Sequence, residues 1–324
     1  MRSKSAIAVG ALALMCVGTA AQTAYAANVK ITPLGSHDGE FCLLDRALIF
    51  EDPDGTRLLY DPGRTVRGGD DPRLGKIDGV LLSHVHFDHL GDAYQPAANA
   101  GECGKPDFSV KATPESVTVM VVVAKKAKLV IGGEQNYFFP PKVKRAGGDP
   151  SQVKLVRFGA ETKVGGVKIT TVPAAHTNGL DPKFIEGPLS EELAANGLTA
   201  YLGPPAGFVV QFTNGLVAYL SGDTGITAEQ DVVVHRYYKA NFAVMNIGGV
   251  FTTGPVEAAY VINHLVRPNS VIASHANEVA TKNGKLLPNT KTALFKKSVK
   301  VPVYVPLSGK TMQFNGKGRC VAGC

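Results

Sequence analysis

Residues 81–92 of this chain read Leu81-Leu82-Ser83-His84-Val85-His86-Phe87-Asp88-His89-Leu90-Gly91-Asp92. Three histidines and an aspartate thus occupy six positions, directly after an apolar run at residues 79–82 that is typical of a buried strand. Imidazole and carboxylate groups suit zinc and similar divalent ions. His84 and His86 can aim at one ion, whereas Asp88 and His89 follow a turn and can reach a second ion. We interpret this stretch as the ligand loop of a two-metal site.

The sequence on both sides of this loop predicts an α/β protein. Apolar runs bounded by glycine, proline and aspartate predict strands at residues 48–50, 57–60, 79–82, 168–172, 208–212, 216–220 and 270–273. Helices are expected at residues 113–128, 190–196 and 254–266, and His235 and His264 also fall in expected helices. The residues Thr213-Asn214-Gly215 predict a hairpin between two of the strands. Such a mixture places chemistry on loops at strand ends.

The ligand loop matches, at every defined position, the His-x-His-x-Asp-His motif of the metallo-β-lactamase superfamily, which this sequence resembles. The resemblance implies an α/β fold of four layers, an αβ/βα sandwich. In that family a further histidine, a bridging aspartate and a last histidine follow in order. His176, Asp223 and His275 meet that order here, and each lies at the end of an expected strand.

The resemblance also implies a role for each candidate ligand. One metal ion would be held by His84, His86 and His176. The other would be held by Asp88, His89 and His275, with Asp223 bridging the two ions. Zinc is the expected metal and manganese the second choice.

In this family the expected chemistry is hydrolysis of a small-molecule substrate. A hydroxide between the two ions would attack a carbonyl or phosphoryl centre of a lactone, ester, amide or phosphodiester. Asp88 would be catalytic as well as a ligand, relaying a proton to the leaving group. An insert at residues 178–207 is expected to form a lid or pocket wall.

Two further residues are expected to support the site. Asp61 stands where the superfamily keeps an aspartate that hydrogen-bonds a metal-bound histidine, although an ordinary turn before Pro62 would also explain it. His37 lies in a Gly-Ser-His-Asp-Gly loop that could face the metal ions.

Within the superfamily, the segment from Met245 to His275 is similar to the branch that contains L-ascorbate 6-phosphate lactonase. The chain departs from that branch at Ser274-His275-Ala276-Asn277, where a Pro-x-His followed by an aromatic residue is usual. The substrate therefore stays open. A di-iron redox protein would use the same ligands together with a redox partner domain, for which we find no sequence signal. A non-catalytic metal-dependent binding protein of the cell envelope is the other alternative.

The first 26 residues are typical of a signal peptide. Arg2 and Lys4 precede an apolar run at residues 7–17, which is shorter than the ~20 residues that a membrane span needs, and Ala24-Tyr25-Ala26 suits cleavage. We expect residues 27–324 to form a single domain, periplasmic or secreted, without an integral membrane segment. Cleavage takes two basic residues from a net charge of +7 and leaves +5, spread along the chain, so no nucleic-acid partner is expected.

Four cysteines remain after the expected cleavage, at positions 42, 103, 320 and 324. An even count in an oxidising compartment predicts two disulfides, with three pairings open. We favour Cys42 with Cys103 and Cys320 with Cys324. A cysteine zinc site would need paired short spacings, which Cys42 and Cys103 do not supply.

Overall fold

The structure is a computed structural model that describes Met1 and residues 27–324. The predicted signal peptide, residues 1–26, therefore lies outside the described residues apart from Met1. Within the described part of the chain, no helix has both the length and the apolar character needed to cross a bilayer.

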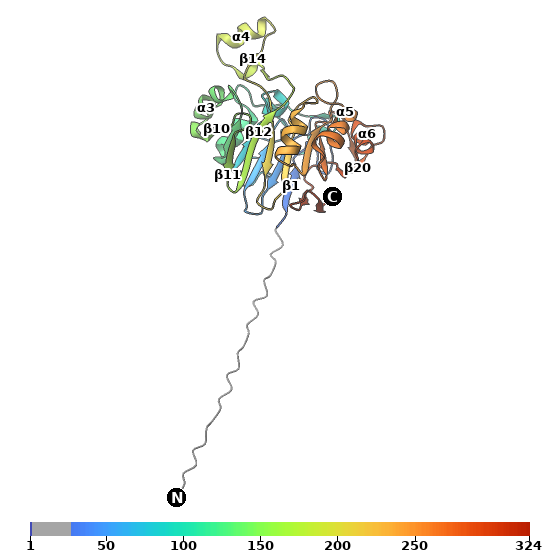
Figure 1. Ribbon diagram of the computed structural model, residues 1–324. Helices are drawn as coiled ribbons and strands as arrows, with labels where there is room; N and C mark the ends of the chain where they lie inside the picture. Colours follow the sequence, from blue (N-terminus) through green and yellow to red (C-terminus); the bar gives the residue numbers. More distant parts are fainter. Residues whose placement is uncertain (2–26) are drawn as a thin grey trace.

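Two mixed sheets form the centre of the molecule (Figure 1). The first has the order β10 (Val153–Leu155), β9 (Lys128–Ile131), β4 (Gly79–Leu81), β3 (Arg57–Tyr60), β2 (Leu48–Glu51), β1 (Val29–Pro33), β22 (Met312–Phe314) and β23 (Cys320–Ala322). The second has the order β11 (Glu161–Val164), β12 (Val167–Pro173), β15 (Ala206–Gln211), β16 (Val217–Leu220), β17 (Phe242–Asn246), β18 (Val271–Ser274) and β21 (Val303–Tyr304).

The two sheets pack face to face through a shared apolar core. Phe50 of the first sheet stacks on Phe212 beside the second, with ring centroids 5.9 Å apart, and Tyr60 meets Phe208 edge to face at 6.3 Å. Large apolar side chains of this kind each contribute roughly 1.5–3 kcal/mol when fully buried. The alternation that this requires is visible in β1, where Val29 and Ile31 are buried.

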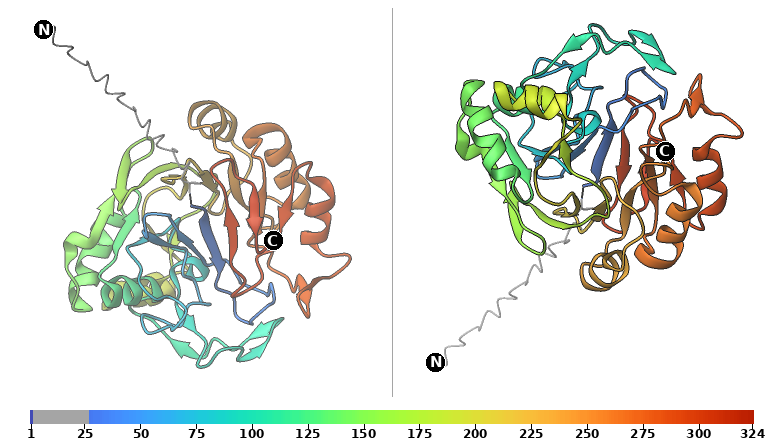
Figure 2. Two further views of the ribbon diagram at one scale, coloured as in Figure 1. Left: turned by 90° about the horizontal axis from the view of Figure 1, so that it is seen from below. Right: turned by 90° about the horizontal axis from the view of Figure 1, so that it is seen from above.

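Helices cover the outer face of each sheet, as the two views of Figure 2 show. The first sheet is covered by α2 (Val117–Lys125) and α3 (Gln135–Arg145). The second is covered by η3 (Gln230–Tyr237), α5 (Pro255–Tyr260), its continuation η4 (Val261–Val266) and α6 (Lys291–Ser298). The layers are therefore helix, sheet, sheet and helix, which confirms the predicted four-layer αβ/βα sandwich.

Most predicted elements are present, with boundaries set by local chemistry. The helix expected at residues 113–128 begins only at Val117, because the Ser116 hydroxyl accepts a hydrogen bond from the Val119 N–H and caps it. The hairpin between β15 and β16 is confirmed, and Gly215 takes a positive φ of 92° there. Helix α3 was not predicted, because Pro140 and Pro141 break its sequence pattern.

Residues 178–205 form an arm that projects from the body at the top of Figure 1. It contains β13 (Gly179–Leu180), η2 (Pro182–Phe184), α4 (Pro188–Ala195) and β14 (Ala200–Tyr201), and β13 pairs with β14. Leu180 and Phe184 anchor its base in the core under α2 and α3, whereas α4 buries none of its residues. The arm makes up most of the insert at residues 178–207 that the sequence analysis interpreted as a lid or pocket wall, and β15 begins at Ala206.

The smaller elements lie in the connections. They are α1 (Phe87–Leu90), β5 (Ala93–Tyr94), β6 (Gly101–Glu102), β7 (Lys105–Pro106), β8 (Val110–Lys111), η1 (Pro150–Gln152), β19 (Thr281–Lys282) and β20 (Lys285–Leu286). Cys42 is bonded to Cys103, with Cα atoms 4.9 Å apart, and Cys320 to Cys324, which is the pairing that the sequence analysis favoured.

Candidate metal centre

Four loops at one edge of the sandwich carry the seven predicted ligands. They follow the carboxyl ends of β4, β12, β16 and β18. The strands β16, β17 and β18 are parallel, and β12 runs the same way because it is antiparallel to β15, which is antiparallel to β16. Their carboxyl ends therefore meet at one edge. A hydrogen bond of 3.0 Å from the Ala206 N–H to the Ser83 carbonyl joins the first sheet's ligand loop to the second sheet.

The first group of donor atoms comes from three histidines. The Nδ1 atom of His86 lies 3.0 Å from Nε2 of His84 and 3.2 Å from Nε2 of His176. These three nitrogens lie within 4.8 Å of one another. They are the residues predicted to share one ion.

The second group consists of Asp88, His89 and His275, whose donor atoms also lie within 4.8 Å of one another. The Asp88 Oδ2 atom is 3.4 Å from Nε2 of His275 and 3.9 Å from Nε2 of His89. Both Asp88 and His89 are carried by the short helix α1, so one turn of backbone fixes their separation.

Asp223 lies between the two groups and is only 3% exposed. Its Oδ2 atom is 3.0 Å from His275 Nε2, 3.7 Å from His176 Nε2 and 3.9 Å from His84 Nε2. Its Oδ1 atom is 3.3 Å from His89 Nε2. One carboxylate thus reaches histidines of both groups, as a bridging ligand must.

The donor atoms fit divalent metal ions in their chemistry as well as their spacing. Among the described residues, His89 Nε2, His275 Nε2 and Asp223 Oδ1 are buried without a hydrogen-bond partner. Buried polar atoms are normally paired, so three that converge on one point fit the coordination of a cation.

The histidines of the cluster differ in the direction in which their pKa values are shifted. Burial, with His89 close by, lowers the pKa of His84 well below its usual value, and burial together with His176 lowers the pKa of His86 to about 4. Both rings are therefore neutral at pH 7, which is the form that binds a metal.

His89 behaves in the opposite way. Burial disfavours its protonation, but the carboxylates of Asp223, Asp61 and Asp88 outweigh burial and raise its pKa to about 10. In the metal-free protein His89 therefore carries a proton that a metal ion must displace.

Asp61 hydrogen-bonds one of the candidate ligands. Its Oδ2 atom accepts a hydrogen bond of 2.8 Å from Nδ1 of His89, and the Ser83 hydroxyl and N–H both donate to the same carboxylate at 2.8 Å. Asp61 is completely buried. The His89 ring is thereby oriented with Nε2 toward the cluster.

Three polar residues that sequence reasoning missed hold the ligand loops together. The Asn178 side chain accepts from the Val85 N–H at 2.8 Å, between the first two histidines. The Thr224 hydroxyl accepts from the Ala175 N–H at 3.0 Å, next to His176. Asn246 accepts from the Ser221 hydroxyl at 2.9 Å and donates to the Thr224 carbonyl at 3.1 Å, on either side of Asp223.

Arg46 is the most informative residue that the sequence analysis missed. Its side chain is only 1% exposed, and its Nη2 atom lies 2.7 Å from Oδ2 of Asp88. Burial raises the pKa of Asp88, but Arg46 and His89 outweigh burial and hold it well below its usual range. No local motif marks this arginine, because it precedes Asp88 by more than forty positions.

His37 does not join the cluster. Its Nε2 atom donates to the Gly101 carbonyl at 3.1 Å, and its Nδ1 atom lies 3.1 Å from the Ser36 hydroxyl. No hydrogen bond within residues 27–324 links His37 to a candidate ligand. Its supporting role stays a prediction.

The comparisons with known proteins agree with this geometry. The sequence model of one protein family, described as a beta-lactamase superfamily domain, matches residues 56–276. A protein of Polynucleobacter asymbioticus named UPF0173 metal-dependent hydrolase is 28% identical over 274 residues, which cover 81% of each chain.

Two solved structures share the fold. A metallo hydrolase from the archaeon Ignicoccus hospitalis superimposes with a TM-score of 0.58 at 21% identity, covering 89% of this chain and 99% of that one. The diiron beta-hydroxylase CmlA from Streptomyces venezuelae superimposes with a TM-score of 0.54 at 12% identity, covering 89% of this chain and 54% of that one. At these identities the likeness concerns the fold alone.

Proposed function

Because this chain belongs to the metallo-β-lactamase superfamily, we propose that it is a metal-dependent hydrolase that works with two divalent ions. The observation that carries the proposal is the convergence of seven donor side chains into two groups of three, linked by the carboxylate of Asp223. The relatives named metal-dependent hydrolases support the same activity.

Each group of ligands has a defined task in this proposal. His84, His86 and His176 would hold one ion, and Asp88, His89 and His275 the other. When bound, the two ions would lower the pKa of a water molecule toward ~7 and polarise the substrate oxygen. The Asp88 carboxylate lies at the edge of the cluster, where it can accept a proton from that water and pass it to the leaving group.

The proposed substrate is a small molecule with a carbonyl or phosphoryl centre. Phe87, between two candidate ligands, is partly exposed, and the cations of Arg64 and Lys183 lie 4.3 and 5.1 Å from the centre of its ring. Lys183 belongs to the projecting arm, which supports a role for the arm in the wall of the substrate site. The proposed substrate classes are lactones, esters, amides and phosphodiesters, and the ascorbate-phosphate lactonase branch stays a prediction.

We also propose that the protein is exported. The signal-like segment at residues 1–26 supports this, and so does the pairing of all four cysteines beyond it, since structural disulfides persist in oxidising compartments.

Metal analysis combined with a hydrolysis panel tests the proposed function. Purified protein loaded with zinc or manganese should carry close to two ions per chain and cleave at least one of a lactone, a phosphodiester, a thioester and a β-lactam. Iron with redox activity and no hydrolysis would favour the di-iron alternative, whose fold is represented by CmlA. Two bound ions with neither activity would favour a binding protein.

A further inference from the structure

Arg46 occupies an unusual place for an arginine, inside the candidate metal centre. Its Nη2 atom contacts the same Asp88 oxygen, Oδ2, that approaches His89 and His275. The contact of 2.7 Å is a charge-assisted hydrogen bond between a side chain that is 1% exposed and one that is 13% exposed. A cation of the protein therefore competes for the oxygen that the second metal ion needs.

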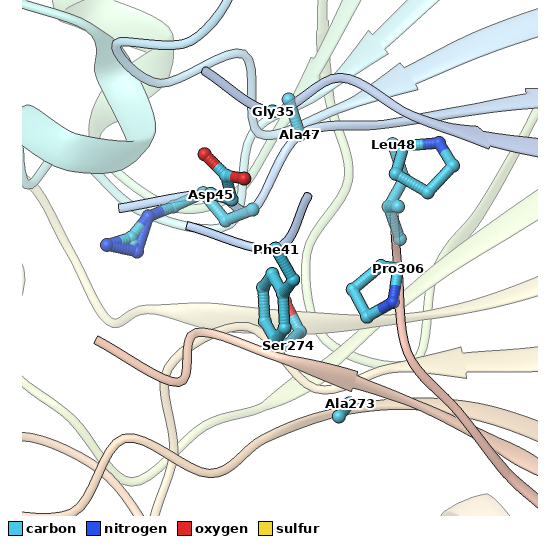
Figure 3. Close-up of a pocket in the computed structure, with 10 residues that line it drawn as sticks. Gly35, Phe41, Asp45, Ala47, Leu48, Ala273, Ser274 and Pro306 are labelled. Atoms are coloured by element: carbon cyan, nitrogen blue, oxygen red, sulfur yellow. The ribbon is translucent and has the colours of Figure 1, made fainter. Parts of the chain in front are cut away.

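Asp45, the residue before Arg46 in the sequence, is already hydrogen-bonded within its own loop. Asp45 accepts hydrogen bonds of 2.8 Å from the N–H groups of Ser36 and Cys42, and so stabilises its own loop. Asp45 and Arg46 line a cavity of about 10 Å³, the space of one water molecule. Figure 3 shows Gly35, Asp45 and Ala47 on one side of this cavity and Ala273 on the other.

The other N–H groups of Arg46 form no hydrogen bond in the described residues that would hold the side chain at another site. Its Nε and Nη1 atoms are buried without a hydrogen-bond partner among the described residues. Within residues 27–324, the side chains within hydrogen-bond distance of Arg46 are reached through Nη2, namely Asp88 and, at 3.3 Å, the amide oxygen of Asn277. Asn277 belongs to the Ser274-His275-Ala276-Asn277 segment, so the departure noted in the sequence contributes a contact that holds Arg46.

We propose that Arg46 makes the two metal positions unequal, by pairing with Asp88 in the metal-free protein and weakening the Asp88–His89–His275 position. This inference rests on the proposed two-metal function. Among residues 27–324 no lysine or arginine hydrogen-bonds His84, His86 or His176, so we expect the three-histidine position to fill first. The second ion binds only at the expense of the Arg46–Asp88 contact.

The sign of the effect follows from the two states that binding connects. In the metal-free state the guanidinium compensates the buried Asp88 charge, which lowers the free energy of that state. In the metal-bound state the same cation lies beside a divalent ion and repels it. Both effects oppose binding of an ion at the Asp88–His89–His275 position. They are weaker at the His84–His86–His176 position, because Arg46 contacts none of those three histidines.

Stepwise zinc titration of metal-free protein tests this inference without any activity measurement. Calorimetry with a competing chelator should resolve a tight and a weaker step in the wild type. Arg46→Met, which removes the charge and keeps the length, should tighten the weaker step by roughly 10–100-fold and leave the tight step unchanged. The metal-free variant should also melt roughly 5–15 °C lower, because Asp88 loses its partner.

Two control variants separate charge from general perturbation. Arg46→Lys keeps the cation and should retain a weak second step. Arg73→Met removes a comparable arginine, paired with the buried Asp71 at 2.6 and 3.0 Å but away from the ligand set, and should leave both steps unchanged. If metal-free Arg46→Met does not fold, Arg46→Gln, which is neutral and keeps an N–H donor, replaces it.

The possible failures are distinguishable. A second step that is unchanged or weaker in Arg46→Met, with two zinc ions still bound to the wild type, would overturn the role of Arg46 alone. A wild-type protein that binds no zinc in either step would overturn the proposed function itself.

Discussion

Asp88 is the residue on which the proposed chemistry depends most directly, because its carboxylate would both bind a metal ion and transfer a proton. Asp88→Ala should therefore reduce kcat/KM by more than the ~10²–10⁴-fold expected for a lone acid–base group. Its metal content should fall from two ions toward one. The matched control is Asp70→Ala, since Asp70 is exposed on the surface. Wild-type turnover by Asp88→Ala would contradict the two-metal hydrolysis.

A substitution at Asp61 tests a residue that orients a candidate ligand, His89, and is not itself a candidate ligand. Asp61→Ala removes the acceptor for His89 Nδ1, so the ring loses its orientation and its basicity. Zinc affinity should fall roughly 10–100-fold, as for other outer partners of metal-binding histidines, and competition with a chelator measures it. Unchanged zinc affinity would mean that packing alone fixes the His89 ring.

The pKa of His89 predicts a proton release. Because the folded-state pKa is raised to about 10, the protonated form stabilises the metal-free fold fully below the ordinary histidine pKa of ~6.5, and this stabilisation is lost as the pH rises through about 10. At pH 8, zinc binding should therefore release about one proton from His89 and none from His86, whose pKa is about 4. Calorimetry in buffers of different ionisation enthalpy counts the released protons. A metal-bound water of pKa ~7 would add about one proton to the one from His89, so a total of one or fewer would contradict the assignment.

At the scale of elements, Asp92 joins the ligand loop to the projecting arm. It is buried and pairs with Arg64 at 2.6 Å and with Lys183 of the arm at 3.0 Å. Asp92→Ala should loosen the arm, and cleavage by a protease within residues 178–205 should become roughly 5–150-fold faster, as expected for roughly 1–3 kcal/mol of lost interaction.

The control for Asp92→Ala is an aspartate outside the arm that also pairs with two basic side chains. Asp231 of helix η3 pairs with Arg236 of the same helix and with Arg267, which follows η4, each at 2.6 Å. Asp231→Ala should leave the cleavage rate of the arm unchanged. Equal acceleration in both variants would point to global rather than local loosening.

At the scale of the whole molecule, the two disulfides should contribute unequally to stability. Cys42–Cys103 spans 61 positions and Cys320–Cys324 spans four. Chain entropy then gives an upper estimate of about 4 kcal/mol for the first disulfide and about 2 kcal/mol for the second. The Cys42→Ala/Cys103→Ala double variant should lose more stability in urea than Cys320→Ala/Cys324→Ala. Thiol titration of unreduced, denatured wild type should find almost no free sulfhydryl, and four free thiols would contradict the proposed export.

The sequence by itself determined the kind of fold and the identity of the candidate ligands. Residues 81–92 supply four of the seven candidate ligands as a local pattern after a buried strand, and their motif carries the resemblance that implies the four-layer fold. The same resemblance implies His176, Asp223 and His275, which meet the family's order at the ends of expected strands. Helix α3 was missed for a reason of the same kind, since Pro140 and Pro141 hide a helix that tertiary packing of Phe139 and Val143 enforces.

Only the tertiary structure decided what surrounds those ligands. Arg46 reaches Asp88, and Asn178 reaches Val85, across separations at which no sequence pattern operates. Such contacts arise because two sheets bring the ends of distant strands to one edge, where buried polar groups must find partners. His37, which is half-buried, hydrogen-bonds the Gly101 carbonyl. The candidate metal ligands can be read from sequence motifs. The charges and hydrogen bonds around each ligand depend on the packing of the whole chain.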